Sequence, residues 1–454
     1  MQLANAQNST TTNKHAFSLQ QCISYAAKNN VQVKNALLNI KIQEQTNRGI
    51  TAAALPQVNG SIAATHYLNV PVQSFPNFIA AATYGVLTQE GVKDGNGNAI
   101  VAPSDFGFIQ AQFGTPYNAN AGISLTQLLF DGQVFVGLQA RAASIEFQNK
   151  AAAITEEGIR ANIYKVYYQL VLAKTQIALL DANIERLEKL LSDATALYKN
   201  GFAEKLDIDK INVQITNLKT EKQKATSAIE VGKMGLKMLM GMPVSDELIL
   251  TDEFTETDVT TDILTETTGI YNSRLDYQYL NTVKKLNEYN IKRYQLSYIP
   301  TIALSATYSK QALRNRFDFF KKGDWFTASF VSLSLQVPIF DGFSKDAKIK
   351  QSRLELQQTL NNINQLQQNI DMEVAKAAFN FRNALKTIDF QKKNMELSEK
   401  VYQQTKKKYE AGTGSNTEIN AAQTDLKTAQ TNYIAALYDA AIARVDYLKA
   451  TGKL

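Results

Sequence analysis

The stretch SLTQLLFDGQ, from Ser124 to Gln133, decides the architecture of this 454-residue chain because a second version of it occurs far downstream. The second version is SLQVPIFDGF, from Ser334 to Phe343. Each contains a few alternating polar and apolar residues, then Phe-Asp-Gly, then a very long mixed run. The separation, 334 − 124 = 210 residues, is close to half of the chain. The sequence therefore predicts that one architecture occurs twice.

Composition excludes several classes of protein. The net charge of +6 is too small at this length to indicate nucleic-acid binding. The single cysteine, Cys22, rules out an internal disulfide and a cysteine-based zinc site. The two histidines, His15 and His66, are far apart in the sequence. No constellation for catalysis appears, so we expect no enzyme, no cofactor and no metal site.

The N-terminal segment, residues 1–16, is predicted to be a tail. Within it, ANAQ at residues 4–7 is similar to the small-residue end of a signal peptide, although an ordinary disordered tail gives the same pattern. Cys22 lies in LQQC, which lacks the small residue expected before a lipidated cysteine. We therefore expect Cys22 to be a buried apolar position. The chain also lacks the run of about 18 apolar residues that a transmembrane helix needs.

Two very long helices are predicted from the spacing of proline and glycine, the main helix breakers. Residues 133–200 contain no proline and only two glycines, Gly137 and Gly158. Residues 343–411 contain neither proline nor glycine. Each run predicts a helix of about 68 residues, or roughly 100 Å. In the second run, apolar and aromatic residues recur every seven positions, as in a left-handed coiled coil.

Each long run ends at a similar turn signal. Tyr198 lies three residues before Gly201, and Tyr409 lies three residues before Gly412. Glycine just past a helix is the usual left-handed cap. A returning helix after each turn would complete an antiparallel hairpin in each half. The return helices are expected at 204–240 and 416–450.

The similarity between the halves extends upstream of the long helices. Pro56 and Pro300 each precede a strand and follow a helical run, expected at 17–54 and at about 268–298. Each half is thus predicted to contain helix, strand, strand, long helix, turn and helix. The first repeat is placed at 17–242 and the second at 268–454, joined by an acidic linker, 243–267. The strands are expected at about 57–69, 117–130, 301–312 and 325–339.

The predicted strands alternate between apolar residues and small, uncharged polar residues. After Pro300, for example, Ile302 and Leu304 alternate with Thr301 and Ser305. A half-buried sheet of a soluble protein gives this pattern, and so does a sheet between lipid and a water-filled lumen. The second explanation is favoured because such long helices offer no evident core to cover. Lipid-exposed strands must close into a barrel, which four strands cannot do, whereas three copies supply twelve.

In this order, these motifs resemble those of the TolC-like outer-membrane efflux proteins over essentially the whole chain. The motifs are ALP and YIP before the first strand of each half, LLFDG and PIFDG before the long helices, and Tyr-x-x-Gly after them. The resemblance implies a mostly α fold with a membrane β-barrel. In it, a homotrimer builds a 12-stranded β-barrel in the outer membrane, continued by a periplasmic helical (coiled-coil) barrel.

The function implied by this resemblance is that of an exit duct. Such a channel belongs to a tripartite efflux or type I secretion system and conducts substrates passively from the periplasm to the exterior. Its expected partners are a periplasmic adaptor protein, an inner-membrane pump and outer-membrane lipid, with no nucleic acid. The periplasmic tip is expected to be opened by the adaptor or the pump.

The resemblance also implies a periplasmic gate. The family's acidic ring, six residues after each turn glycine, falls on Asp207 and Glu418, and its tyrosine tie to the first-half acid falls on Tyr409. A second acidic ring position falls on Ala421, and an arginine tie falls on Gly414, so both are absent. Acids in the first turn of a helix are also favoured by the helix dipole alone. The hairpin tips, where adaptor contact is expected, contain Tyr198, Gly201, Gly412 and Gly414.

Two other functions remain as alternatives. A periplasmic adaptor also has a long helical hairpin, but it should have one hairpin flanked by small β-rich halves. A soluble structural coiled coil would not need the Pro-rich strand regions. The sequence also predicts that the first strand–strand connection is the longer one, with an extracellular loop near 70–107.

Overall fold

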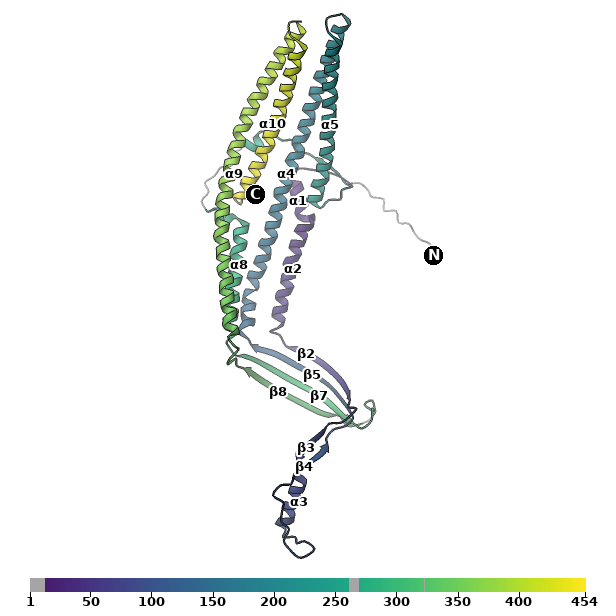
Figure 1. Ribbon diagram of the computed structural model, residues 1–454, viewed down its shortest axis with the longest axis vertical. Helices are drawn as coiled ribbons and strands as arrows, with labels where there is room; N and C mark the ends of the chain where they lie inside the picture. The colour runs from purple at the N-terminus through teal and green to yellow at the C-terminus, as the bar shows by residue number, and fades with distance from the viewer. Residues whose placement is uncertain (1–12, 261–268, 322) are drawn as a thin grey trace, which may run out of the picture. The chain divides into compact units, whose positions relative to one another are not determined.

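The computed structural model describes residues 13–260, 269–321 and 323–454 (Figure 1). The chain divides into two compact units. The helical unit comprises residues 1–47, 139–292 and 348–454, and the sheet unit comprises residues 48–138 and 293–347. Residues 1–12 of the predicted tail lie outside the described residues.

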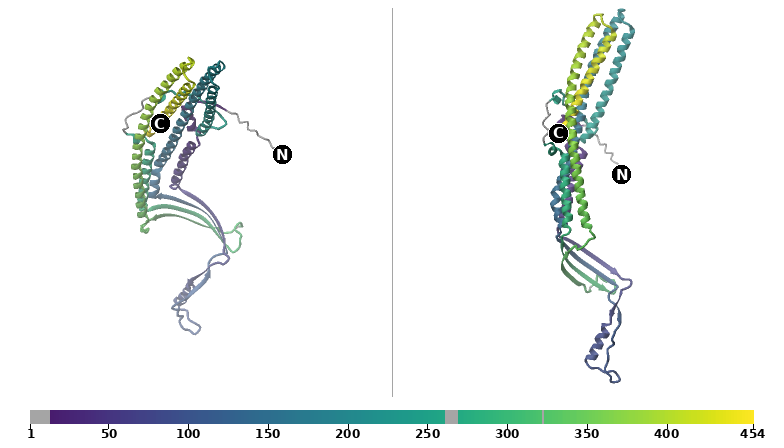
Figure 2. Two further views of the ribbon diagram at one scale, coloured as in Figure 1. Left: turned by 45° about the horizontal axis from the view of Figure 1, so that its top comes forward. Right: turned by 60° about the vertical axis from the view of Figure 1, so that its left-hand side comes forward.

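Two long helices, each followed by a returning helix, dominate the helical unit (Figures 1 and 2). Helix α4 spans Gly132–Lys199 and α5 spans Lys205–Met240. Helix α9 spans Ser344–Glu410 and α10 spans Asn416–Ala450. The lengths of α4 and α9, 68 and 67 residues, agree with the ranges in which helix breakers are scarce. None of the described helices combines the length and the apolar character needed to cross a membrane.

The two hairpins pack together through one apolar cluster near their turns. It includes Leu187 of α4, Ile211 of α5, Tyr402 of α9, and Ile419 and Leu426 of α10. Residues from all four helices therefore share one buried core. Along α9, the seven-residue pattern buries Val374, Phe381 and Ile388, among others.

The first helical run, expected as one segment over 17–54, is two helices. Helix α1 spans Leu19–Asn29 and α2 spans Val31–Ala52. Asn30 separates them because its side chain caps the start of α2 and also bonds to α5. Its Oδ1 accepts hydrogen bonds from the backbone N–H groups of Gln32 and Val33, and its Nδ2 donates to the Leu239 carbonyl at 2.7 Å. The corresponding region of the second half contains α7 (Ile270–Ser273) and α8 (Leu275–Leu296).

The predicted tail and linker contain a small parallel sheet, which corrects the expectation for residues 14–16. Strand β1 (Lys14–Phe17) pairs with β6 (Glu247–Leu250). Helix α6 (Thr257–Thr260) follows in the linker, while residues 261–267 lie outside the described residues. Residues of β1 alternate between exposed and half-buried, and Leu248 of β6 is buried, so one face of the pair packs against the helices. The two strands are more than 200 residues apart, so no local pattern predicts them.

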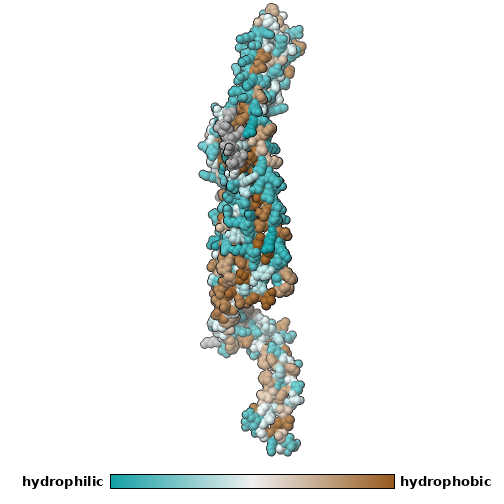
Figure 3. All heavy atoms as spheres, turned by 90° about the vertical axis from the view of Figure 1, so that its left-hand side faces the viewer, coloured by the Kyte–Doolittle hydropathy of each residue, from teal (hydrophilic) through white to brown (hydrophobic). Residues whose placement is uncertain are grey.

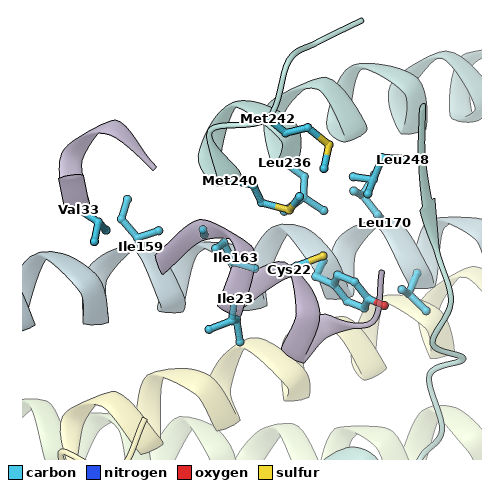
Figure 4. Packing of buried hydrophobic residues seen from close by; sticks show 13 residues of the cluster. Cys22, Ile23, Val33, Ile159, Ile163, Leu170, Leu236, Met240, Met242 and Leu248 are labelled. Atoms are coloured by element: carbon cyan, nitrogen blue, oxygen red, sulfur yellow. The ribbon is translucent and has the colours of Figure 1, made fainter. Parts of the chain in front are cut away.

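Beneath this small sheet lies the core cluster of Figure 4, which includes Cys22, Ile163, Leu236, Met240 and Leu248. Cys22 is completely buried, as expected. Burial, together with the charge of Asp252, raises the pKa of the Cys22 thiol to about 12. The thiol therefore stays protonated at neutral pH and packs as a small apolar side chain.

The sheet unit contains a four-stranded antiparallel sheet in the order β2-β5-β7-β8. The strands are β2 (Gln57–His66), β5 (Tyr117–Phe130), β7 (Thr301–Arg314) and β8 (Phe326–Gln336). Directly opposed residues form rows across the sheet. One row is apolar and consists of Val58, Leu125, Ala306 and Val331; the next row, on the other face, is polar and consists of Gln57, Thr126, Ser305 and Ser332.

The connection near 70–107, expected as a loop, contains regular structure. Strand β3 (Val72–Pro76) pairs antiparallel with β4 (Phe108–Gln112). Helix α3 (Phe78–Gln89) lies between them and has no charged residue. Asn77 caps α3 by accepting a hydrogen bond from the Ala80 N–H, a local signal that the glycine- and proline-rich composition of this region concealed.

Candidate gate at the ends of the helical hairpins

The two hairpin turns have the same backbone geometry. Gly201 and Gly412 adopt left-handed φ values of 78° and 71°. The Gly201 N–H donates to the Tyr198 carbonyl at 3.0 Å, and the Gly412 N–H donates to the Tyr409 carbonyl at 3.0 Å. The conformation suits glycine because a Cβ would be strained at this φ. The two halves thus end their long helices by the same device.

Gly414 fits tightly against the second turn. A Cβ at this position would lie 3.0 Å from the Tyr409 backbone nitrogen and 3.1 Å from the Lys408 Cβ. Its N–H donates to the Lys408 carbonyl at 3.0 Å. The turn therefore leaves little room for the arginine that the resemblance implies at this position.

The turn tyrosines differ in exposure although their backbone carbonyls have the same role. Tyr198 is 44% exposed, next to Phe202, which is 81% exposed. Tyr409 is only 9% exposed and belongs to the apolar cluster shared by the two hairpins. The first turn therefore presents aromatic surface, and the second turn buries it.

Asp207 joins the two hairpins. It is the third residue of α5, and its Oδ2 accepts a hydrogen bond from the Glu204 N–H at 3.4 Å, as a residue of the first helical turn can. Its Oδ1 accepts a hydrogen bond of 2.7 Å from Nδ2 of Asn416, the first residue of α10. Asn416 is buried, and its own Oδ1 accepts from Nδ2 of Asn420 at 2.9 Å.

Glu418 occupies the equivalent third position of α10 but is exposed and bonds within its own turn. Its Oε2 accepts from the Ser415 N–H at 3.3 Å, and Ser415 Oγ accepts from the Glu418 N–H at 3.2 Å. This reciprocal pair is a capping box. Ala421, where a further acid is absent, is also exposed.

Tyr409 lies in the electrostatic field of Asp207, but its hydroxyl is not bonded to that carboxylate. Burial raises the pKa of the Tyr409 phenol, and the charges of Asp207 and Asp193 raise it further. Within the described part of the chain, Asp207 takes its inter-hairpin hydrogen bond from Asn416. The residue that ties the first-half acid here is therefore an asparagine that sequence reasoning missed.

A buried amide network lies between α4 and α10, farther from the turns. Asn183 is 1% exposed, and its Oδ1 accepts from Nε2 of Gln423 at 2.7 Å. Its Nδ2 donates to Oε1 of Gln430 and to the Leu179 carbonyl, both at 2.8 Å. Gln423 and Gln430 are themselves buried. The spacing of 416, 420, 423 and 430 places these amides on one side of α10, which was the available sequence signal.

Ion pairs surround this polar interface. Lys427 of α10 lies 2.6 Å from a Glu221 oxygen of α5, and Arg186 of α4 lies 3.6 Å from a Glu399 oxygen of α9. These pairs are partly exposed, so each contributes little to stability by itself. No cluster of three His, Cys, Asp or Glu side chains suited to a metal ion occurs among the residues the structure describes.

Comparison with known families and sequences identifies relatives of this chain. The family model described as Outer membrane efflux protein matches residues 285–453. The chain is 23% identical over 349 residues to the outer membrane efflux protein BepC of Brucella suis biovar 1 (strain 1330), which covers 73% of this chain and 72% of the relative. It is 22% identical over 210 residues to the proteases secretion protein PrtF of Dickeya chrysanthemi, which covers 45% of this chain and 44% of the relative.

Solved structures share the fold over nearly the whole chain. A structure of CusC superposes with a TM-score of 0.75 at 16% identity, covering 97% of this chain and 93% of that one. The outer membrane protein VceC of Vibrio cholerae gives a TM-score of 0.69 at 14% identity, covering 96% of both chains. The solved structures confirm the fold that the resemblance implies, and the family model and the relatives agree with the resemblance seen in the motifs.

Replacing Asn183 with alanine should destabilise the helical unit. The change leaves the buried Gln423 and Gln430 amides without their shared partner, and an unsatisfied buried polar group costs about 1–3 kcal/mol. We expect a lower midpoint of thermal unfolding, measured by circular dichroism of the detergent-extracted protein. Asn212→Ala, on an exposed position of α5, is the control and should leave the midpoint unchanged. Equal midpoints for Asn183→Ala and the wild type would contradict a stabilising network.

Proposed function

We propose that the chain is a TolC-like outer-membrane efflux protein and that three copies of it assemble into one channel. The channel is the exit duct of a tripartite efflux or type I secretion system. It conducts substrates passively from the periplasm to the exterior, and it works with a periplasmic adaptor and an inner-membrane pump. The observation that carries the proposal is the four-stranded sheet, which has one apolar face and two edges that no other described strand pairs with.

The edges of this sheet suit closure by further copies. Strands β2 and β8 lie at opposite edges and run in opposite directions, because each neighbouring pair in the order β2-β5-β7-β8 is antiparallel. Strand β8 of one copy can therefore pair antiparallel with β2 of the next. Three sheets of four strands give 3 × 4 = 12 strands. The lengths of β2 and β8, 10 and 11 residues, suit tilted strands that span a bilayer, which need about 9–11 residues.

The two faces of the sheet suit lipid and water. The row with Val58, Leu125, Ala306 and Val331 has only apolar side chains, and the neighbouring row on the other face has only uncharged polar ones. In a closed barrel, the apolar face would meet lipid and the polar face would line the lumen. This arrangement supports insertion in the outer membrane.

Exposed apolar seams on the long hairpins suit lateral contact between copies. On α9, Leu354, Met372 and Phe390 are 18 residues apart, about five helical turns, so they share one face; they are 67%, 62% and 67% exposed. Phe379 and Leu397 lie on the same face. Figure 3, which views the α9 side, shows hydrophobic residues recurring along the otherwise hydrophilic helices.

A second seam occurs on α5, in the other hairpin. Val213 and Val231 are also 18 residues apart and are 59% and 67% exposed. A seam on each hairpin allows the α9 face of one copy to pack against the α5 face of the next. Such a head-to-tail contact forms a closed ring when the rotation between successive copies closes.

Acidic side chains at the hairpin ends support a gate. Asp207 and Glu418 occupy the third position of their helices, so a trimer would bring 3 × 2 = 6 carboxylates to the hairpin ends. A ring of carboxylates attracts cations and disfavours its own closure through repulsion. The hydrogen bond from Asn416 to Asp207 offsets part of that repulsion within each copy. We propose that this bond holds the closed state, with Tyr409 burying one side of the carboxylate and Tyr198, Gly201, Gly412 and Gly414 forming the ends that an adaptor contacts.

Acidic substitution of the α9 seam should break up the trimer. In Phe379→Asp/Phe390→Asp, six charges per trimer would be placed in apolar contacts, which should weaken assembly by at least about tenfold. Mass measurement of the detergent-extracted protein should then show monomers. Phe320→Asp, a change at a 93% exposed phenylalanine in the β7–β8 connection, is the matched control. A trimer of undiminished stability in the double variant would contradict the seam as the interface.

Removing either partner of the inter-hairpin bond should open the gate. Asn416→Ala deletes a hydrogen bond to a charged group, worth about 1.5–3 kcal/mol, and leaves the carboxylates in place, so the open fraction in planar bilayers should rise about tenfold or more. Asp207→Ala deletes the same bond but also removes three of the repelling carboxylates, so its increase in open fraction should be smaller. The double variant should open no more than the stronger single variant, since both remove the same bond. Tyr409→Phe should have a smaller effect, because its hydroxyl is not bonded to Asp207. A larger effect of Tyr409→Phe would favour the tyrosine tie instead, and unchanged conductance in Asp207→Ala and Asn416→Ala would refute the gate.

Neutralising Glu418 should change ion selectivity without opening the gate. Glu418→Gln keeps an oxygen that can accept from the Ser415 N–H, so the cap of α10 is retained while three charges leave the trimer. We expect reversal potentials to show weaker cation preference, and divalent cations to block less. Glu410→Gln, at the end of α9, is the control because its carboxylate is paired with Lys406 at 3.6 Å. Equal selectivity of Glu418→Gln and the wild type would leave Glu418 as a helix cap only.

A further inference from the structure

Strand β6 has one paired edge and one unpaired edge. The Glu247 N–H donates to the Asn13 carbonyl at 2.9 Å, and the Thr251 N–H donates to the Phe17 carbonyl at 3.2 Å. In a parallel pair, alternate residues direct their main-chain groups to the partner strand. The main-chain groups of Leu248 and Leu250 therefore point away from β1, and no described strand pairs with that side of β6.

A cavity of about 500 Å³ lies along β6, between the strand and helices α4 and α5. Residues 246–250 form its strand side. Leu170 and Val171 of α4 and Ile229 of α5 give it apolar walls. Leu170 and Leu248, which lie close together in Figure 4, both line the cavity and both belong to the apolar core cluster. We name this feature, bounded by β6 and those three helical residues, the β6 groove.

The charges around the β6 groove are mostly paired. The Glu230 carboxylate lies 2.8 Å from Lys233, and the Glu247 carboxylate lies 2.9 Å from Lys14. Lys237 donates to the Val244 and Asp246 carbonyls at 2.6 and 2.9 Å. Lys174, which also lines the cavity, has neither an ion-pair nor a hydrogen-bond partner in the described part of the chain. Asp252 also lines the cavity, and its Oδ2 accepts a hydrogen bond from the Leu19 N–H at 2.8 Å. The groove therefore combines apolar walls with one unpaired cation, Lys174, and one hydrogen-bonded carboxylate, Asp252.

We propose that the β6 groove binds an extended peptide segment of another protein by strand addition. Main-chain groups of the peptide would pair with those of Leu248 and Leu250, an apolar side chain would enter the cavity, and an acidic side chain would meet Lys174. Only a peptide backbone satisfies a strand edge and an apolar pocket together; a lipid chain would leave the edge unpaired. The site lies within one copy, so the proposal does not depend on the channel or its gate.

The test uses the full-length protein in detergent and a synthetic probe. The probe is a seven-residue peptide of alternating valine and glutamate, with blocked ends and a fluorescent label. Its binding is measured by fluorescence anisotropy. Two N-methylated versions, one methylated on the valine amides and one on the glutamate amides, remove the donors from one edge of the peptide at a time. Strand addition predicts that one version loses binding and the other keeps it.

Substitution at Lys174 tests the charge. Lys174→Glu should weaken binding of the probe at least about fivefold. Lys189→Glu, an exposed lysine elsewhere on α4, is the matched control and should leave binding unchanged. Conductance in planar bilayers should be unaffected by either variant, which separates this site from the proposed channel function.

Several outcomes would overturn strand addition at the β6 groove. Absence of probe binding up to about 1 mM is one, and equal binding by both N-methylated probes is another. Binding to Lys174→Glu as tight as to the wild type would also overturn it, as would a groove filled by a second copy of the chain.

Discussion

The constraint on which this structure depends is that an apolar helix face or a strand edge needs a partner, and one chain cannot provide all of them. Helices α4 and α9, at 68 and 67 residues, are far longer than any single core could enclose. The two hairpins bury part of each other's apolar surface in one shared cluster near their turns, but α9 and α5 each keep an exposed row of apolar residues. The sheet has the same deficit, because β2 and β8 are left as edges. Doubling the motif within the chain reduces the deficit, and the proposed assembly of three copies would remove the rest.

The sequence predicts the parts of the fold that local rules control. Scarcity of proline and glycine predicts the long helices, and the left-handed turns follow from Gly201 and Gly412, since few other residues adopt that φ without strain. The break at Asn30 escapes this reasoning because asparagine interrupts a helix only when its side chain caps the next one. Strands β1 and β6 escape it for a different reason. They are four residues long and pair across more than 200 residues, so their stability comes from contacts that no window of sequence contains.

For the candidate gate, the sequence predicts the positions of the acidic residues but not the residues that bond to them. A resemblance transfers positions, and it places Asp207 and Glu418 correctly in the first turns of α5 and α10. It does not transfer partners. Gly414 leaves little room for a side chain, and the inter-hairpin hydrogen bond is made instead by Asn416, 209 residues from Asp207. An asparagine that begins a helix is common as a local cap, so its long-range bond could not be read from its position.

The buried amides along α10 show what kind of interface joins the hairpins. An apolar contact alone allows neighbouring helices to pack in more than one register, because one leucine fits the hole of another. Asn183 bonds both Gln423 and Gln430, and any shift along the helix axis would leave these groups buried without partners. The network thus fixes one register, at a cost in stability relative to a purely apolar contact. The buried side-chain oxygens of Asn420 and Gln423, which accept no hydrogen bond within the described part of the chain, are part of that cost. Because Asp207 and Asn416 lie at the end of the same interface, the register that the amides select is also the one that brings the acid and its asparagine within hydrogen-bonding distance.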